Sequence, residues 1–184
     1  MPTSRDTAGV RCVLFDLDGT LVDSRQDIAT SLDAALATHG LGPLGIEKAR
    51  SFVGDGVRKL IERAIEATGG DPADTDRLIE TYLDAYRVRH LDTTSLYGGV
   101  AETLQLLAAR GVACGVVTNK PWEFSVSLLE HLGVRRYFAS VIGGDSLASR
   151  KPDPEPLYVA IDECGAQRSL SWMVGDGETE IRTG

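Results

Sequence analysis

The sequence is poor in cysteine and has neither a long apolar run nor an apolar leader. Its three cysteines, Cys12, Cys114 and Cys164, are an odd number without metal-type pair spacing, which argues against a disulfide framework or a zinc site. No stretch approaches the ~20 apolar residues of a membrane span. The first twelve residues lack the apolar region of a secretory signal. We therefore expect a cytoplasmic protein that does not contact membranes.

The sequence also has fewer basic than acidic residues. Lysine and arginine total 19 against 27 aspartate and glutamate residues, a formal net charge of −8. Without a global positive field, generic binding to nucleic acid is disfavoured, although one local phosphate site is compatible with this balance. The hydrophobic share of 42% and charged share of 25% are ordinary globular values, which excludes disordered and fibrous classes.

Four short apolar runs, at residues 10–15, 112–117, 137–142 and 171–174, predict strands. Each run is too short for a helix and nearly continuous in apolar character, as expected of strands buried on both faces. Helical patterns lie between the later runs and end at Gly111, Gly133 and Gly165. The alternation predicts an α/β fold with a Rossmann-like parallel sheet and right-handed crossovers.

Residues 24–92 interrupt this alternation. They contain no strand-like run but three helical patterns, around residues 28–36, 57–65 and 78–86, separated by glycine- and proline-containing breaks. We predict an all-helical cap subdomain at 24–92, inserted into a core formed by 1–23 and 93–184. Only nine residues follow Gly175, so we also expect the core to be truncated at its C-terminus.

The strongest chemical signal is the acidic turn Asp16-Leu-Asp18-Gly19 directly after the first predicted strand. Open α/β sheets bind ligands at the carboxyl ends of their strands. Residues two apart in extended chain point the same way, so Asp16 and Asp18 can address one site, and Gly19 permits the tight turn. Two carboxylates this close repel each other unless a cation or a shared proton relieves them. An acidic turn without function is the alternative.

Polar groups follow the next two predicted strands. Thr118 and Asn119 come after the second strand, where a hydroxyl, a carboxamide and helix-start N–H groups suit a phosphate, or where either side chain caps the helix instead. Lys151 comes after the third strand, in a Lys-Pro-Asp-Pro segment. Its ammonium suits phosphate binding and neutralisation of Asp16; a solvated loop lysine is the alternative.

Acidic groups follow the fourth predicted strand. Asp176 can complete an oxygen-ligand site for Mg²⁺, a cation that usually takes one or two carboxylates with waters and substrate phosphate. Glu180 or Glu178 can order a metal-bound water. The alternative for these two glutamates is a favourable position at a helix N-terminus.

In this order, the segment 16–24 (DLDGTLVDS), Thr118, Lys151 and Gly175-Asp176 resemble the four motifs of the haloacid dehalogenase superfamily. The helical insert resembles the cap of its phosphoglycolate phosphatase-like branch, as do FVGDG at 52–56 and TNK at 118–120. The resemblance implies Mg²⁺-dependent hydrolysis of a small phosphorylated metabolite, with 2-phosphoglycolate as the expected substrate, through an aspartyl-phosphate. A phosphomutase or pyrophosphatase of the same fold, or a non-catalytic phosphate-binding relic, remains the alternative.

The resemblance also implies residue roles. Asp16 is the expected nucleophile and Asp18 the general acid and base. The expected metal ligands are the Asp16 carboxylate, the Asp18 main-chain carbonyl and Asp176, and the expected phosphate ligands are Gly19, Thr118, Asn119 and Lys151. Glu180 stands where the family pattern has aspartate and is expected to reach a metal-bound water. Asp55 and Arg58 of the cap are candidates for substrate choice, and the protein is expected to be a monomer or homodimer.

Overall fold

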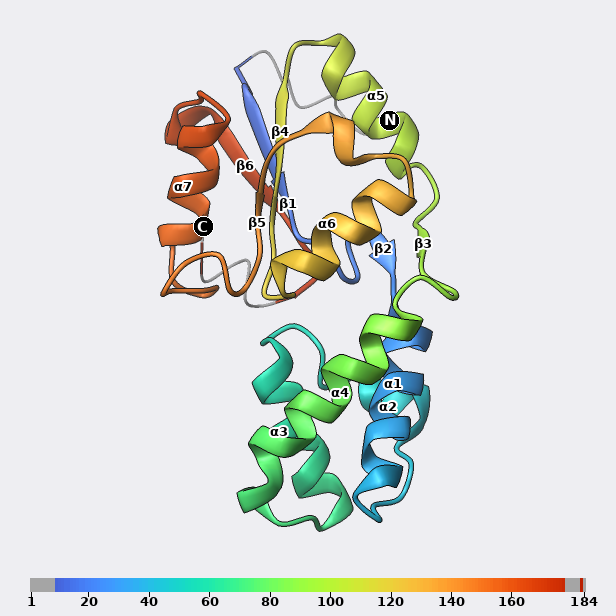
Figure 1. Cartoon of the computed structure of the whole chain (residues 1–184). Helices are drawn as coiled ribbons and strands as arrows, with labels where there is room; N and C mark the ends of the chain where they lie inside the picture. The colour runs from blue at the N-terminus through green and yellow to red at the C-terminus, as the bar shows by residue number, and fades with distance from the viewer. Residues whose placement is uncertain (1–8, 178–182, 184) are drawn as a thin grey trace, which may run out of the picture.

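Four parallel strands form the sheet of this computed structural model, which describes residues 9–177 and 183. They are β1 (Cys12–Phe15), β4 (Ala113–Val117), β5 (Phe138–Ile142) and β6 (Ser171–Val174), in the order β5-β4-β1-β6 (Figure 1). In the register, Leu14 of β1 lies opposite Gly115 on one side and Met173 on the other. The predicted α/β class with a parallel sheet is confirmed.

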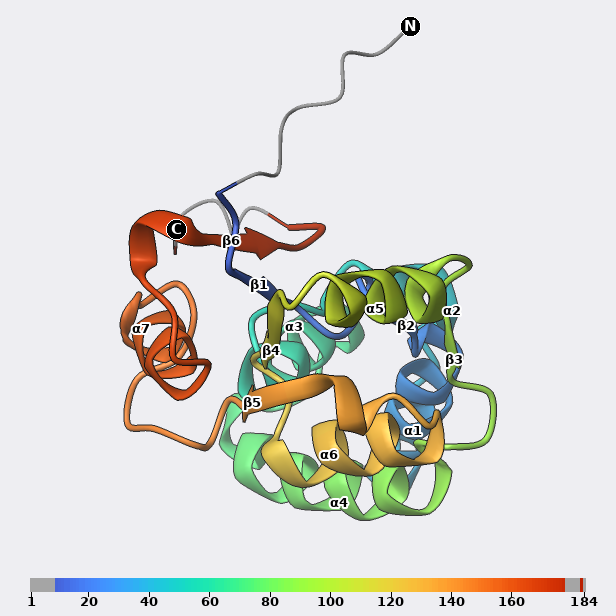
Figure 2. The same ribbon diagram turned by 90° about the horizontal axis from the view of Figure 1, so that it is seen from above.

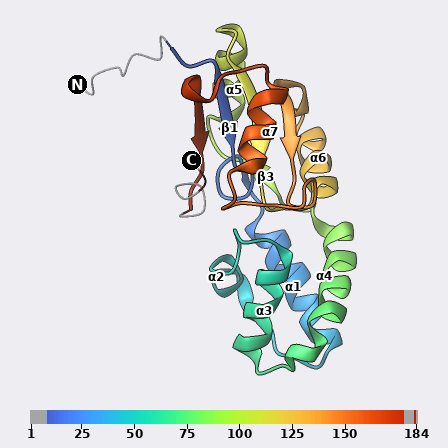
Figure 3. The same ribbon diagram turned by 90° about the vertical axis from the view of Figure 1, so that its left-hand side faces the viewer.

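Helices cover both faces of the sheet. Helices α5 (Val100–Ala109) and α6 (Trp122–His131) lie on one face and α7 (Glu155–Glu163) on the other (Figures 2 and 3). Side chains of β1 alternate accordingly: Val13 and Phe15 pack in the cluster under α5 and α6, whereas Cys12 and Leu14 pack in the cluster under α7. Short 3-10 turns occur at Pro72–Asp74, Arg135–Tyr137 and Arg168–Leu170.

The prediction that all four strands are buried on both faces is wrong for β6. Its residues alternate between half-buried and exposed, with Trp172 49% and Val174 39% exposed. Within the described part of the chain β6 pairs only with β1, so it is an edge strand and one of its faces meets solvent. In β5, Ala139 is likewise exposed.

A separate group of helices lies beyond the carboxyl ends of the strands (Figure 1). It contains α1 (Arg25–Thr38), α2 (Gly45–Arg50), α3 (Val57–Thr68) and α4 (Thr75–Arg89). Three of these match the predicted helical patterns. The sequence analysis did not predict α2, a six-residue helix in which only Ala49 is buried. The helices enclose their own apolar cluster, centred on Leu32, Leu36, Ile61 and Leu78.

Two short strands link this helical group to the sheet. They are β2 (Val22–Asp23) and β3 (Ser95–Leu96), paired antiparallel, and neither was predicted, since two-residue strands leave no periodicity to detect. Among residues 9–177 and 183, no helix combines the length and the apolar character that crossing a bilayer requires.

Candidate active site

The turns after β1 and β6 bring three predicted acidic residues to one place. Asp16 is 7% exposed, and Asp16, Asp18 and Asp176 line the same cleft. Gly19 has φ +86°, and a Cβ atom built there would lie 2.3 Å from Oδ2 of Asp176. The left-handed backbone favours glycine at this position, and the missing side chain lets the Asp176 carboxylate approach closely. The sheet thus gathers groups that are 160 residues apart in sequence.

Lys151 is buried against Asp16. Its Nζ lies 2.9 Å from Oδ1 of Asp16, and only 1% of the lysine side chain is exposed. A buried ammonium is costly unless an anion compensates it, so each group stabilises the other in this position. The solvated loop position considered for Lys151 is excluded.

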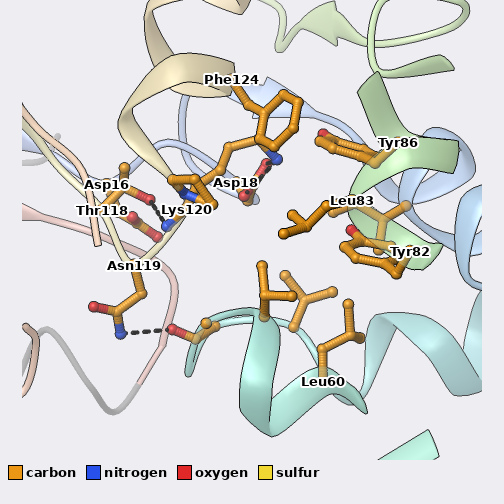
Figure 4. Close-up of a pocket in the computed structure, with 16 residues that line it drawn as sticks. Asp16, Asp18, Leu60, Tyr82, Leu83, Tyr86, Thr118, Asn119, Lys120 and Phe124 are labelled. Atoms are coloured by element: carbon orange, nitrogen blue, oxygen red, sulfur yellow. Dashed lines mark hydrogen bonds and ion pairs between the residues drawn. The ribbon is translucent and has the colours of Figure 1, made fainter. Parts of the chain in front are cut away.

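Asp18 has a cationic partner that the sequence analysis missed. Nζ of Lys120 lies 3.0 Å from Oδ1 and 3.1 Å from Oδ2 of Asp18 (Figure 4). Ser24 Oγ donates to Oδ1 of Asp18 at 2.5 Å. The Lys120 side chain is 4% exposed, and Nζ lies 4.6 Å from the ring centroid of Tyr86, a cation–π contact.

The small number of lysines in the sequence was the signal that could have drawn attention to Lys120. The chain contains four lysines, Lys48, Lys59, Lys120 and Lys151, against fifteen arginines. Two of the four are buried, and each of these two compensates one aspartate of the acidic turn.

The Asn119 side chain ties two loops together. Its Nδ2 donates to the main-chain oxygen of Gly54 at 3.0 Å (Figure 4). It also donates to the main-chain oxygen of Lys151 at 3.1 Å. Both amide hydrogens are therefore engaged, and binding of a phosphate oxygen would require the release of one carbonyl. The main-chain N–H of Gly19 is engaged similarly, since it donates to the oxygen of Val22 at 3.0 Å.

Thr118 is buried, and its Oγ1 accepts from the main-chain N–H of Lys120 at 3.2 Å. As predicted, the segment 118–121 leads directly into a helix: α6 begins at Trp122, and the Trp122 N–H donates to Asp145 Oδ1 at 2.7 Å. Neither Thr118 nor Asn119 caps α6, because Asp145 provides that acceptor.

Two cavities meet at the aspartate pair. An open polar cleft of about 810 Å³ has Asp16, Asp18 and Asp176 on the sheet side and Arg50 and Arg63 on the helical side. Beside it, a cavity of about 50 Å³ reaches Asp18 and Lys120 between mostly apolar walls (Figure 4). The walls include Leu60, Tyr82, Leu83, Tyr86 and Phe124.

The two cap residues proposed for substrate choice differ in position. Asp55 lines the polar cleft and pairs with Arg63. Arg58 lines neither cavity, because its guanidinium pairs with Asp76 on the exposed side of α3 and α4.

The oxygen groups in the cleft fit a hard divalent cation. Among the described residues, no three His, Cys, Asp or Glu side chains gather as a metal cage. The predicted set needs fewer: two carboxylates, from Asp16 and Asp176, and the main-chain carbonyl of Asp18. Mg²⁺ commonly keeps waters and substrate oxygens in its remaining positions, so this small set suits it. Glu180 and Glu178 lie outside the described residues.

Comparisons with known proteins identify the family of the chain. A family model described as haloacid dehalogenase-like hydrolase matches residues 13–184. Phosphoglycolate phosphatase of Pseudomonas fluorescens (strain Pf0-1) is 39% identical over 175 residues, 93% of this chain and 64% of that protein. Phosphoglycolate phosphatase of Agrobacterium fabrum is 39% identical over 170 residues, 91% of this chain and 73% of that protein.

A solved structure gives the same answer for the fold. The crystal structure of a predicted phosphoglycolate phosphatase from Haemophilus somnus 129PT superposes with a TM-score of 0.89 at 29% identity, over 95% of this chain and 80% of that one. The chain spans 64% of the length of the Pseudomonas relatives. The family model covers nearly all of the chain, which therefore belongs to the haloacid dehalogenase-like hydrolases, in the branch that resembles phosphoglycolate phosphatases.

Proposed function

We propose that this site hydrolyses small phosphate monoesters with Mg²⁺, through an aspartyl-phosphate, and that 2-phosphoglycolate is among its substrates. One observation carries the proposal: Asp16 lines a cleft together with Asp18 and Asp176, and the buried ammonium of Lys151 pairs with its carboxylate. Phosphoryl transfer requires positioned groups and charge neutralisation more than elaborate covalent chemistry, and this arrangement supplies both.

The aspartates divide the reaction into two steps. In the first, a carboxylate oxygen of Asp16 attacks phosphorus, the bond to the ester oxygen breaks, and Asp18 gives that oxygen its proton. In the second, a water attacks the aspartyl-phosphate, Asp18 takes the water's proton, and inorganic phosphate leaves with Asp16 restored. Lys151 and Thr118 flank the nucleophile and are placed to balance charge on the phosphoryl oxygens.

Asp16, Asp176 and the Asp18 carbonyl would hold Mg²⁺, which when bound supplies charge stabilisation at a phosphoryl oxygen. We further propose that residues 24–92 act as a cap over a core of 1–23 and 93–184, since β2 and β3 form the paired connection between them. A cap at this position can exclude bulk water during transfer. Cytoplasmic location and a monomeric or dimeric state stay predictions from the sequence.

The nucleophile assignment is tested with Asp16→Asn. We expect release of inorganic phosphate from 2-phosphoglycolate to require Mg²⁺ and to fall by about a thousand-fold or more in this variant, because the amide cannot form the acyl phosphate. Asp84→Asn, on the exposed side of α4, is the matched control and should retain activity. Activity that survives in Asp16→Asn at more than a tenth of the original rate would contradict the assignment.

A further inference from the structure

The ion pair with Asp18 does not by itself explain the surroundings of Lys120. Among the described residues that line the small cavity, Lys120 is the one cationic side chain. Its ammonium has three N–H donors, and the two oxygens of Asp18 accept two of them. The ring of Tyr86 lies on another side of Nζ, at 4.6 Å, and offers no hydrogen-bond acceptor oxygen in that contact. Within the described part of the chain no acceptor oxygen engages the third donor, and Lys120 lines the cavity.

The aromatic side chains beside that donor are buried. Tyr86 is 2% and Phe124 2% exposed, and the two rings contact edge to face with centroids 5.0 Å apart. Leu60 and Tyr82 close the helical side. A charge–charge contact is stronger in such surroundings than in open solvent, so an anion that enters the cavity would find its complement in Lys120.

The distances place this donor close to the leaving group of the proposed reaction. If Asp18 contacts the ester oxygen at hydrogen-bonding distance, Nζ of Lys120, 3.0 Å from Asp18 Oδ1, lies roughly 4–5 Å from that oxygen. In an ester with a carboxylate on the adjoining carbon, ordinary bond lengths put a carboxylate oxygen about 3 Å from the ester oxygen. Such an oxygen is within hydrogen-bonding reach of Nζ while Asp18 still acts on the ester.

We propose that Lys120 binds the substrate's carboxylate and makes the site prefer phosphate monoesters that carry a carboxylate on the carbon next to the ester oxygen. This inference rests on the proposed phosphatase function and adds a residue that determines specificity. Lys151 pairs with the nucleophile Asp16, whereas Lys120 binds the carboxylate of the leaving group. The two buried lysines therefore have different roles.

The test compares two esters on wild-type protein and Lys120→Met. The substrates are 2-phosphoglycolate and ethyl phosphate, which has the same ester bond but no carboxylate. A loss in kcat/KM that is common to both substrates measures the effect of removing the cation beside Asp18. The additional loss in kcat/KM on 2-phosphoglycolate measures the carboxylate contact and should be about 30- to 100-fold, as for a hydrogen bond between charged groups. Lys59→Met, a surface lysine paired with Glu62, is the matched control and should change neither.

Three further results bear on the proposal. Lys120→Arg, which keeps the charge, should preserve most of the preference for 2-phosphoglycolate, and thermal unfolding monitored by circular dichroism checks that each variant folds. Equal losses on both esters would overturn the proposal, as would a wild-type protein that turns over ethyl phosphate as efficiently as 2-phosphoglycolate. If wild-type protein with Mg²⁺ hydrolyses neither ester, the proposed function itself fails, and the Lys120 assignment falls with it.

Discussion

Asp27 is a buried anion that two threonines hold by hydrogen bonds. It lies in the first turn of α1, is 2% exposed, and accepts hydrogen bonds from both the main chain and the hydroxyls of Thr93 and Thr94 at 2.5–3.1 Å. These contacts join the chain that leaves the sheet to the chain that returns to it. Burial alone would raise the pKa of Asp27, but the hydrogen bonds lower it more, so the net pKa is below its ordinary value.

Asp27 should therefore stabilise the fold in a pH-dependent way. Because its folded pKa is lowered, its contribution is present above the unfolded pKa of about 3.9 and is lost as pH falls through the folded value. We expect Asp27→Asn to lower the free energy of unfolding by about 2 kcal/mol at pH 7 and to show a shallower loss on acidification than wild type. Urea titrations from pH 7 to pH 3 measure both, with Asp84→Asn as control; parallel pH curves for wild type and Asp27→Asn would refute this role.

Single residues differ in how far the sequence reveals them. Asp16, Asp18, Lys151 and Asp176 follow strands, and the carboxyl ends of parallel strands meet at one edge, so their convergence could be predicted. Lys120 could not be assigned in the same way, because a lysine is buried only if tertiary contacts compensate it, and its contact with Tyr86 comes from a helix more than thirty residues away. The engagement of the Asn119 amide with Gly54 likewise depends on how the helical group docks.

The helical group contacts the layer of helices that covers the sheet where the end of α4 meets α6. Phe124 of α6 belongs to the apolar cluster of the helical group and contacts Tyr86 and His90 of α4. Nε2 of His90 lies 2.9 Å from Ser127 Oγ, which extends the contact along α6. We call this contact of Phe124 and Ser127 with Tyr86 and His90 the α4–α6 seam. It fixes α4 beside the small cavity, whereas the polar cleft opens toward α2.

Phe124→Ala should loosen this seam more than it loosens the sheet. We expect it to lower the free energy of unfolding by about 3 kcal/mol and to speed amide exchange in α4 more than in β4. Phe138→Ala is the matched control: that ring is 4% exposed and contacts Phe15 inside the sheet layer, so its effect should be larger in β4 than in α4. Identical exchange patterns in the two variants would show that the seam is no separate unit.

Helices and strands with clear periodicity were predictable, and the seam was not. The patterns of α1, α3 and α4 reflect burial within one helical group, as amphipathic spacing does. Phe124 fits the periodicity of α6, yet its ring packs with the helical group α1–α4. Periodicity shows that a helix has an apolar face but not which part of the protein that face contacts. The burial of β6 was overestimated for the same reason, since an apolar strand looks alike at the centre and at the edge of a sheet.

The whole molecule is acidic, yet each aspartate of its central turn has a buried lysine beside it. The net charge of −8 makes a distributed phosphate-binding surface unfavourable, so local compensation is what allows an anionic ligand to approach. Lys151 and Lys120 supply it from the sheet side, and Arg50 and Arg63 line the cleft from the helical side. A ligand that bridges the two sides should therefore stabilise the assembly as a whole.

Beryllium fluoride with Mg²⁺ tests this at the scale of the whole molecule, because it mimics a phosphoryl group on an aspartate. A ligand at a hundred times its Kd stabilises the folded state by about 2.7 kcal/mol. For a domain of this size that corresponds to a rise in Tm of roughly 5–10 °C, which differential scanning fluorimetry resolves. Mg²⁺ alone should raise Tm less, and Asp16→Asn should abolish the additional rise because the acceptor oxygen is gone. A wild-type Tm that does not respond, or an equal response in Asp16→Asn, would mean that the aspartates, the lysines and the cation do not form one phosphoryl site.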